Sequence, residues 1–123
     1  MIHGREIPHK AHSDRAIWFD FRALCFGPRS KADYLYLAEH YEMVFVSGLE
    51  RLTPQEKAEA RRLTWLIDVL YDFRVKLCAT SAVSVNDIYV EGDFAEEFTR
   101  TASRMVEMQS EVYLEQPHLT LKK

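Results

Sequence analysis

The chain has 123 residues, of which 47% are hydrophobic and 28% charged, and its formal net charge at pH 7 is −3. This length suits one domain with a core of ordinary size, and the acidic balance excludes the basic surface that nucleic-acid binding usually requires. No apolar run approaches the ~20 residues of a membrane span. We therefore predict a cytoplasmic chain without a transmembrane segment or a nucleic-acid partner.

Residues 1–14 are polar and are predicted to form an N-terminal arm or an edge strand, ahead of a single α/β domain over residues 15–123. His3, His9 and His12 match no common zinc spacing, so no metal site is expected. Cys25 and Cys78 form no C-x-x-C pair. We predict that both are reduced and lie in the core, as is typical of cytoplasmic proteins.

The first half of the domain alternates between strand and helix patterns. Residues Arg15–Phe21 are rich in β-branched and aromatic side chains, which predicts a strand, and Gly27 and Pro28 predict a turn between Leu24 and Ser30. Ser30 is a predicted helix cap, with Asp33 in the first turn. Residues Glu42–Ser47 then predict a second, buried strand.

A longer helix is predicted from Thr53 to Arg74. Thr53 can cap it, Pro54 suits the first turn, and Glu56 can reach back to the cap. Its apolar face is expected at spacings of three and four residues, at Leu63, Leu66, Ile67, Leu70 and Phe73. The short apolar run Val75–Ala79 predicts a third buried strand.

After a loop, Asp93 is the predicted cap of a last long helix, with Glu96 three residues later. Its buried stripe is expected at Phe94, Phe98, Ala102, Met105, Met108 and Val112, and a charged face at Glu96, Arg100, Arg104, Glu107 and Glu111. The charged face indicates either a solvated ladder of ion pairs or arginines that contact a phosphate. The whole order predicts an α/β fold with a mostly parallel sheet flanked by helices and right-handed crossovers.

Three motifs resemble one known family, the ZapE-type (AFG-one-like) P-loop ATPases. They are WFDFRALCFGPRSKADYLYLAEHY, MVFVSGLERLTPQEKAEARRLTWLIDVLYDFRVKL and EFTRTASRMVEMQSEVYL, in that order, within a similarity that extends from about Gly4 to Leu119. The GPRS turn and the tail near Pro117 are more similar to the bacterial cell-division branch than to the mitochondrial branch.

The resemblance implies an AAA-like ATPase that uses ATP and Mg²⁺. Bacterial members act at the inner face of the membrane, at the division ring, with the tubulin-like protein FtsZ, and mitochondrial relatives are linked to protein quality control. The chain lacks a G-x-x-x-x-G-K-[ST] loop, which the family carries upstream, so Asp20 is not expected to hold Mg²⁺. We therefore expect a C-terminal fragment that is inactive alone and needs the N-terminal ATPase half as a partner.

Several residues remain candidates for work on a nucleotide that is bound elsewhere. Arg104 lies in the motif most specific to the family and is the first candidate for a phosphate-sensing or finger arginine, followed by Arg100, Arg61 and Arg62. Thr80 and Ser81 resemble a sensor position at a strand end. Each has a structural alternative, which for Arg104 is an ion pair with Glu107 or Glu111 and for Thr80 and Ser81 is bonding to loop backbone.

Two functions of different class follow. In the first, the chain is the C-terminal portion of an ATPase and its arginines converge on one concavity near the strand ends. In the second, it is a non-catalytic interaction or scaffold module with paired or scattered arginines and an exposed patch that includes Tyr34, Tyr36 or Trp65. A sheet that lacks its neighbours would expose an edge and a face, so self-association is expected, with homo-oligomerisation or peripheral membrane association as further options.

Overall fold

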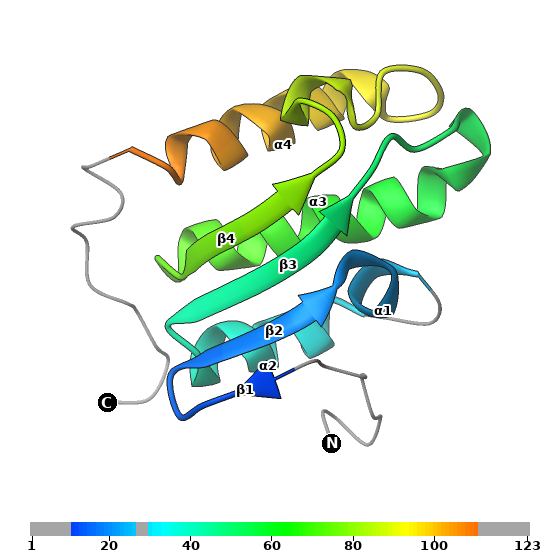
Figure 1. Cartoon of the computed structure of the whole chain (residues 1–123). Coiled ribbons are helices and arrows are strands. Elements are labelled where there is room, and N and C mark those ends of the chain that lie inside the picture. Colours follow the sequence, from blue (N-terminus) through cyan, green and yellow to red (C-terminus); the bar gives the residue numbers. More distant parts are fainter. Residues whose placement is uncertain (1–10, 27–29, 111–123) are drawn as a thin grey trace.

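The computed structural model describes residues 11–26 and 30–110. It shows a four-stranded sheet with helices packed against one face, and the last helix lies beyond the edge strand (Figure 1). The predicted class, an α/β fold with a mostly parallel sheet flanked by helices and ending in a helix, is confirmed.

The sheet has the order β1-β2-β3-β4. β1 (Ala11–His12) pairs antiparallel with β2 (Ala16–Asp20), whereas β3 (Met43–Leu49) and β4 (Lys76–Ser81) continue the sheet in parallel. β1 falls within the range predicted as an arm or edge strand, and residues 1–10 of that range lie outside the described residues.

The two faces of the sheet differ in what covers them. Ile17 and Phe19 of β2 are buried, and so are Val44 and Val46 of β3. The alternate residues of these strands lie on the opposite face, because side chains change face at every residue of a strand. There Trp18 is 40% exposed and Phe45, its partner in register, is 37% exposed. Within the described residues, this open face carries no helix.

The prediction that the third strand is buried is wrong. Val75 is fully buried, but it precedes the strand, and the strand is half-buried at its start and exposed from Cys78 to Ser81. β4 is the last strand of the described sheet and Cys78 is paired with Phe45 on the open face. The prediction of a core cysteine therefore holds for Cys25 and fails for Cys78.

The helices connecting the strands begin at the predicted caps. α2 (Lys31–His40) follows Ser30, whose backbone N–H donates to Asp33 Oδ2 at 2.8 Å. Thr53 precedes the 3₁₀ turn η1 (Pro54–Glu56) and α3 (Lys57–Asp72), and its N–H donates to Glu56 Oε1 at 2.8 Å. The helix α1 (Phe21–Cys25) was not predicted, because a strand end and a turn were expected there.

Most of the core lies between the sheet and α1, α2 and α3, and the buried face of α4 extends it. Tyr34 is fully buried and its hydroxyl donates to the Leu24 carbonyl oxygen at 2.9 Å, which joins α2 to α1. Tyr34 therefore cannot belong to an exposed aromatic patch, whereas Tyr36 and Trp65 are half-buried. Among the described residues, none of the helices combines the length and the apolar character that a membrane span requires.

The last helix, α4 (Ala95–Glu107), begins differently from the prediction. Its cap residue is Phe94, which has a left-handed backbone with φ 68°, and the Asp93 side chain instead pairs with Lys57 at 3.0 Å. The chain turns tightly at Gly92, and Tyr89 fixes this turn by donating to the Asp93 carbonyl oxygen. Because the turn moves the cap by one residue, Phe94 leaves the predicted stripe and is 45% exposed.

The remaining stripe residues Phe98, Ala102, Met105 and Met108 are buried as predicted, and Val112 lies outside the described residues. The 3₁₀ turn η2 (Val85–Asp87) precedes α4 in the loop after β4 and contacts it.

Candidate functional site

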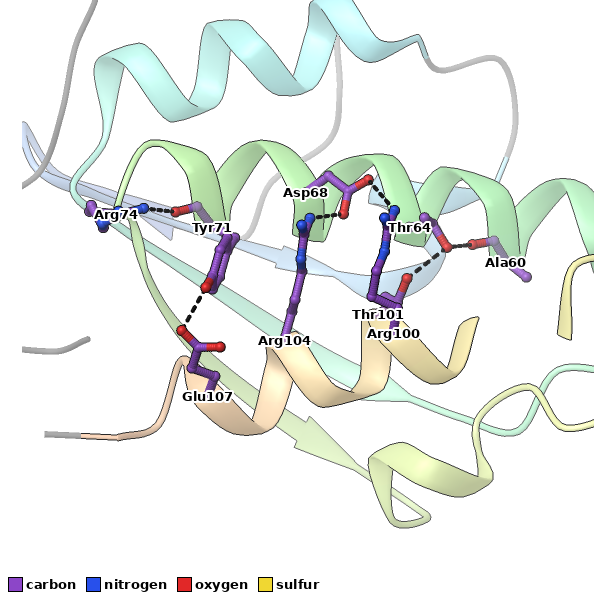
Figure 2. Close-up of polar contacts among 9 residues, drawn as sticks. All are labelled: Ala60, Thr64, Asp68, Tyr71, Arg74, Arg100, Thr101, Arg104 and Glu107. Carbon is purple, nitrogen blue, oxygen red and sulfur yellow. Dashed lines mark hydrogen bonds and ion pairs between the residues drawn. The ribbon is translucent and has the colours of Figure 1, made fainter. Parts of the chain in front are cut away.

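α3 and α4 pack side by side and run in the same direction. Three hydrogen-bonded pairs connect them, with partners 36 or 37 positions apart in the chain, and a longer ion pair joins Arg100 to Asp68. Figure 2 shows the pairs at successive turns: Thr64 with Thr101, Asp68 with Arg104, and Tyr71 with Glu107. We call these six residues the α3–α4 polar ladder.

The first pair is a chain of two hydroxyl groups that is partly buried. The Thr101 hydroxyl donates to Thr64 Oγ1 at 3.2 Å, and Thr64 in turn donates to the Ala60 carbonyl oxygen at 3.0 Å. Thr101 is fully buried, and a buried hydroxyl without a partner would cost ~1–3 kcal/mol. The pair therefore fixes the position of α4 along α3.

The second pair contains the first candidate arginine. Arg104 Nη1 lies 2.6 Å from Asp68 Oδ1, and the two side chains are 27% and 21% exposed. The Arg104 guanidinium also lies 4.8 Å from the centroid of the Tyr71 ring. Its partner is therefore Asp68 of α3, not Glu107 of its own helix, and Glu111 lies outside the described residues.

The third pair explains where Glu107 points. The Tyr71 hydroxyl donates to Glu107 Oε2 at 2.6 Å. This hydrogen bond, more than burial or the Glu107 charge, raises the pKa of Tyr71, because it stabilises the protonated phenol. Arg104 and Glu107 of the predicted charged face thus bind side chains of α3, and Arg100 lies 3.9 Å from Asp68 of the same helix. An i,i+4 pattern within one helix could not have revealed partners on another helix.

Arg61 and Arg62 are neighbours in α3, and their side chains contact different elements. Arg62 Nη1 donates to the Cys25 carbonyl oxygen at 3.2 Å and lies 3.5 Å from Glu59 Oε2. The Arg61 guanidinium lies 3.9 Å from the centroid of the Phe94 ring. Arg62 thus joins α3 to α1, whereas Arg61 reaches the start of α4.

The four candidate arginines therefore separate into two groups. Arg104 and Arg62 are held by carboxylate and carbonyl oxygens within the fold. Arg61 and Arg100 both line one hollow of about 160 Å³ between α2, α3 and α4. Arg100 has a single long ion pair, 3.9 Å to Asp68 Oδ2, and its side chain is 66% exposed.

The sensor-like candidates lie at the carboxyl end of β4 and are exposed. Thr80 Oγ1 accepts a hydrogen bond from the Gly48 N–H at 2.9 Å, and the Ser81 hydroxyl donates to the Val83 carbonyl oxygen at 2.6 Å. On the neighbouring strands, the Ser47 hydroxyl donates to Asp20 Oδ1 at 2.9 Å. Sequence reasoning missed Ser47, which the parallel register places beside Asp20.

A family model and individual proteins of known sequence both match the chain. The chain matches the family described as AFG1-like ATPase over residues 1–117. It is 33% identical to the cell division protein ZapE of Escherichia coli K12, over 96% of the chain and 32% of that protein.

Two eukaryotic proteins are similar as well. An uncharacterised protein of Schizosaccharomyces pombe is 40% identical over 72% of the chain and 19% of its own length. Lactation elevated protein 1 homolog B of Danio rerio is 25% identical over 91% of the chain and 29% of its own length. The chain thus spans 19% to 32% of the length of these relatives. No solved structure matches the chain.

Proposed function

The chain belongs to the AFG1-like ATPase family, and we propose that it serves as a non-hydrolysing α/β module of a longer ATPase. In this proposal, residues beyond these 123 hold and cleave ATP. The chain supplies a rigid unit, joined through the α3–α4 polar ladder, on which the ATPase part and its partners assemble.

The observation that carries the proposal is the missing phosphate loop in a chain that otherwise matches the family over nearly its whole length. The glycines are Gly4, Gly27, Gly48 and Gly92, and no Lys-Ser or Lys-Thr pair follows any of them. A G-x-x-x-x-G-K-[ST] loop binds phosphates through free backbone N–H groups.

The described strand ends support a nucleotide site outside these residues, because their polar groups already have partners within the chain. Open α/β sheets bind ligands at the carboxyl ends of their strands. Here the Gly48 N–H already donates to Thr80, and Asp20 accepts from Ser47. We therefore assign no step of ATP hydrolysis to these residues.

The arginines also support a module rather than a catalytic element. A finger arginine must be free to reach a phosphate. Arg104, the first candidate, is held by Asp68 at 2.6 Å, and Arg62 by the Cys25 carbonyl oxygen. Arg104 is in this proposal a structural residue that fixes α4.

The similarity to ZapE supports a more specific proposal about the cellular role of the longer protein. Two proteins named cell division protein ZapE match 96% of the chain at 33% identity. We propose that the longer protein couples ATP hydrolysis to cell division at the inner face of the membrane, with FtsZ or another division-ring protein as partner. Work in protein quality control is the alternative within the same family.

A reconstitution experiment tests the proposed module. ATP hydrolysis is measured for this chain alone, for the N-terminal ATPase part of a ZapE relative alone, and for the two mixed. We expect no hydrolysis by the chain alone, and a stable complex that hydrolyses ATP on mixing. Hydrolysis by the chain alone, or no complex between two folded partners, would contradict the proposal.

A further inference from the structure

Cationic side chains from three helices surround the hollow of about 160 Å³ between α2, α3 and α4. Lys31 is the first residue of α2, Arg61 lies near the start of α3, and Arg100 lies in the first half of α4. We propose that this hollow binds a phosphate group, between Lys31, Arg61 and Arg100.

The positive charge of the hollow is poorly compensated. Within residues 11–26 and 30–110, neither Lys31 nor Arg61 forms an ion pair. Two carboxylates, Asp68 and Glu97, also line the hollow. Asp68 lies 2.6 Å from Arg104 but 3.9 Å from Arg100, so its charge is mainly neutralised by an arginine outside the hollow. Three cations therefore line the hollow with two carboxylates, one of which is shared with Arg104, in a chain whose net charge is negative.

Arg61 is held in place by an aromatic ring rather than by a carboxylate. Its guanidinium lies 3.9 Å from the centroid of Phe94, and stacking of this kind leaves the N–H groups at the edge of the guanidinium available. Phe94 has φ 68°, a conformation that is uncommon for a bulky residue. Strained residues of this kind cluster at ligand clamps.

The size and chemistry of the hollow indicate a single small group. Pockets for drug-sized ligands are roughly 300–1,000 Å³, so this hollow of about 160 Å³ suits a single phosphate group, either free or at the end of a larger molecule. Guanidinium groups present a planar fork of donors that matches phosphate oxygens, and a lysine adds a point charge. The site is separate from the strand ends, and it is proposed independently of ATP hydrolysis by the longer protein.

The fluorescence of Trp65 tests the proposal, because Trp65 lines the hollow. The chain has two tryptophans, and the other, Trp18, lies on the open face of the sheet. A Trp18→Phe background therefore leaves Trp65 as the reporter. Sodium phosphate is titrated into the 123-residue chain at ionic strength held constant with sodium chloride, and sodium succinate is titrated in parallel. We expect a saturable fluorescence change with phosphate and a weaker one with succinate.

Arg61→Gln and Arg100→Gln are each expected to weaken phosphate binding about ten-fold, because each removes one hydrogen bond to a charged group. The matched control is Arg15→Gln, since Arg15 is an exposed arginine paired with Glu42 and does not line the hollow. Circular dichroism and a thermal melt show that each variant is folded.

Three results would overturn the proposal: no saturable change with phosphate, unchanged binding in both hollow variants, or succinate binding as tight as phosphate. If phosphate binds and ATP competes with it, the bound phosphate group can belong to a nucleotide. If ATP does not compete, the ligand is free phosphate. Both of these outcomes leave the proposed site supported.

Discussion

Arg104 and Asp68 join α4 to α3 through a contact of 2.6 Å between Nη1 and Oδ1, in a setting where both side chains are largely shielded from water. The contact belongs to a ladder with Thr64–Thr101 on one side and Tyr71–Glu107 on the other. Because the three pairs follow one another along both helices, a shift of α4 by one turn would separate the partners of all three. The ladder therefore fixes the register of the two helices.

Breaking the Arg104–Asp68 pair is expected to destabilise the chain by about 1.5–3 kcal/mol, the range for a hydrogen bond to a charged group. Arg104→Gln, Asp68→Asn and the double variant are compared by urea unfolding, which gives the coupling energy of the pair. The control pair is Arg15 with Glu42, which is much more exposed and should contribute ~0–1 kcal/mol. Equal coupling energies for the two pairs would show that the ladder does not hold α4.

The two threonines of the ladder should respond unequally to removal of their hydroxyl groups. Thr64→Val leaves the buried Thr101 hydroxyl without its acceptor, which should cost about 1–3 kcal/mol. Thr101→Val leaves the Thr64 hydroxyl still bonded to the Ala60 carbonyl oxygen, so it should cost ~1 kcal/mol or less. Urea unfolding of both variants measures the difference. The reverse order would show that Thr101 has another acceptor.

The raised pKa of Tyr71 predicts that the folded chain loses stability at alkaline pH. Its pKa is raised above the ordinary value of about 10, chiefly by the hydrogen bond to Glu107. Stabilisation from a raised pKa is fully present below the unfolded-state pKa and is lost as pH rises through the folded-state pKa.

The melting temperature of the native chain should therefore exceed that of Tyr71→Phe at pH 8, and the difference should shrink above pH ~10. Tyr41 and Tyr89 also have raised pKa values, mainly because of burial. Both are present in both proteins, so the comparison isolates Tyr71. A difference that does not change between pH 8 and pH 11 would contradict the role of this hydrogen bond.

Local patterns predicted much of this fold because caps, strands and helix faces are encoded by residues near each other in the chain. Thr53 with Glu56 and Ser30 with Asp33 are examples. What the sequence could not show depends on distant partners. The exposure of Cys78 follows from its place in the last strand, and the partner of Arg104 lies 36 residues away, on another helix.

The start of α4 shows a different limit. Asp93 and Glu96 fit the pattern of a capping box, but Gly92, with φ 119°, and Phe94, with φ 68°, turn the chain so that the helix begins after Phe94. Asp93 then pairs with Lys57. A capping pattern describes side chains, and it does not contain the backbone angles that a tertiary contact imposes.

Gly92 should therefore be intolerant of a side chain. A Cβ atom there would lie 2.6 Å from the Tyr89 hydroxyl oxygen and 3.0 Å from the Pro54 Cα atom. Gly48 is the matched control, because its φ is also positive, at 85°, but a Cβ would meet nothing within 4 Å. Gly48→Ala should cost ~1–2 kcal/mol through backbone strain alone, and Gly92→Ala clearly more. Equal losses in urea unfolding would show that the loop relaxes around the added methyl group.

The open face of the sheet gives the last prediction. Trp18, Phe45 and Cys78 are paired in register across three strands, and on the described part of the chain no helix covers them. Apolar sheet surfaces and open edges promote association, so the 123-residue chain alone should self-associate as its concentration rises.

Phe45→Lys should reduce this association, because it places a charge at the centre of the open face. Sedimentation velocity over a range of concentrations measures the effect. The matched control is Val106→Lys, since Val106 is 53% exposed and lies on α4, away from the sheet. If both variants associate as the native chain does, the contact between copies lies elsewhere. If the native chain stays monomeric at all concentrations, the open face does not drive association, and the prediction is wrong.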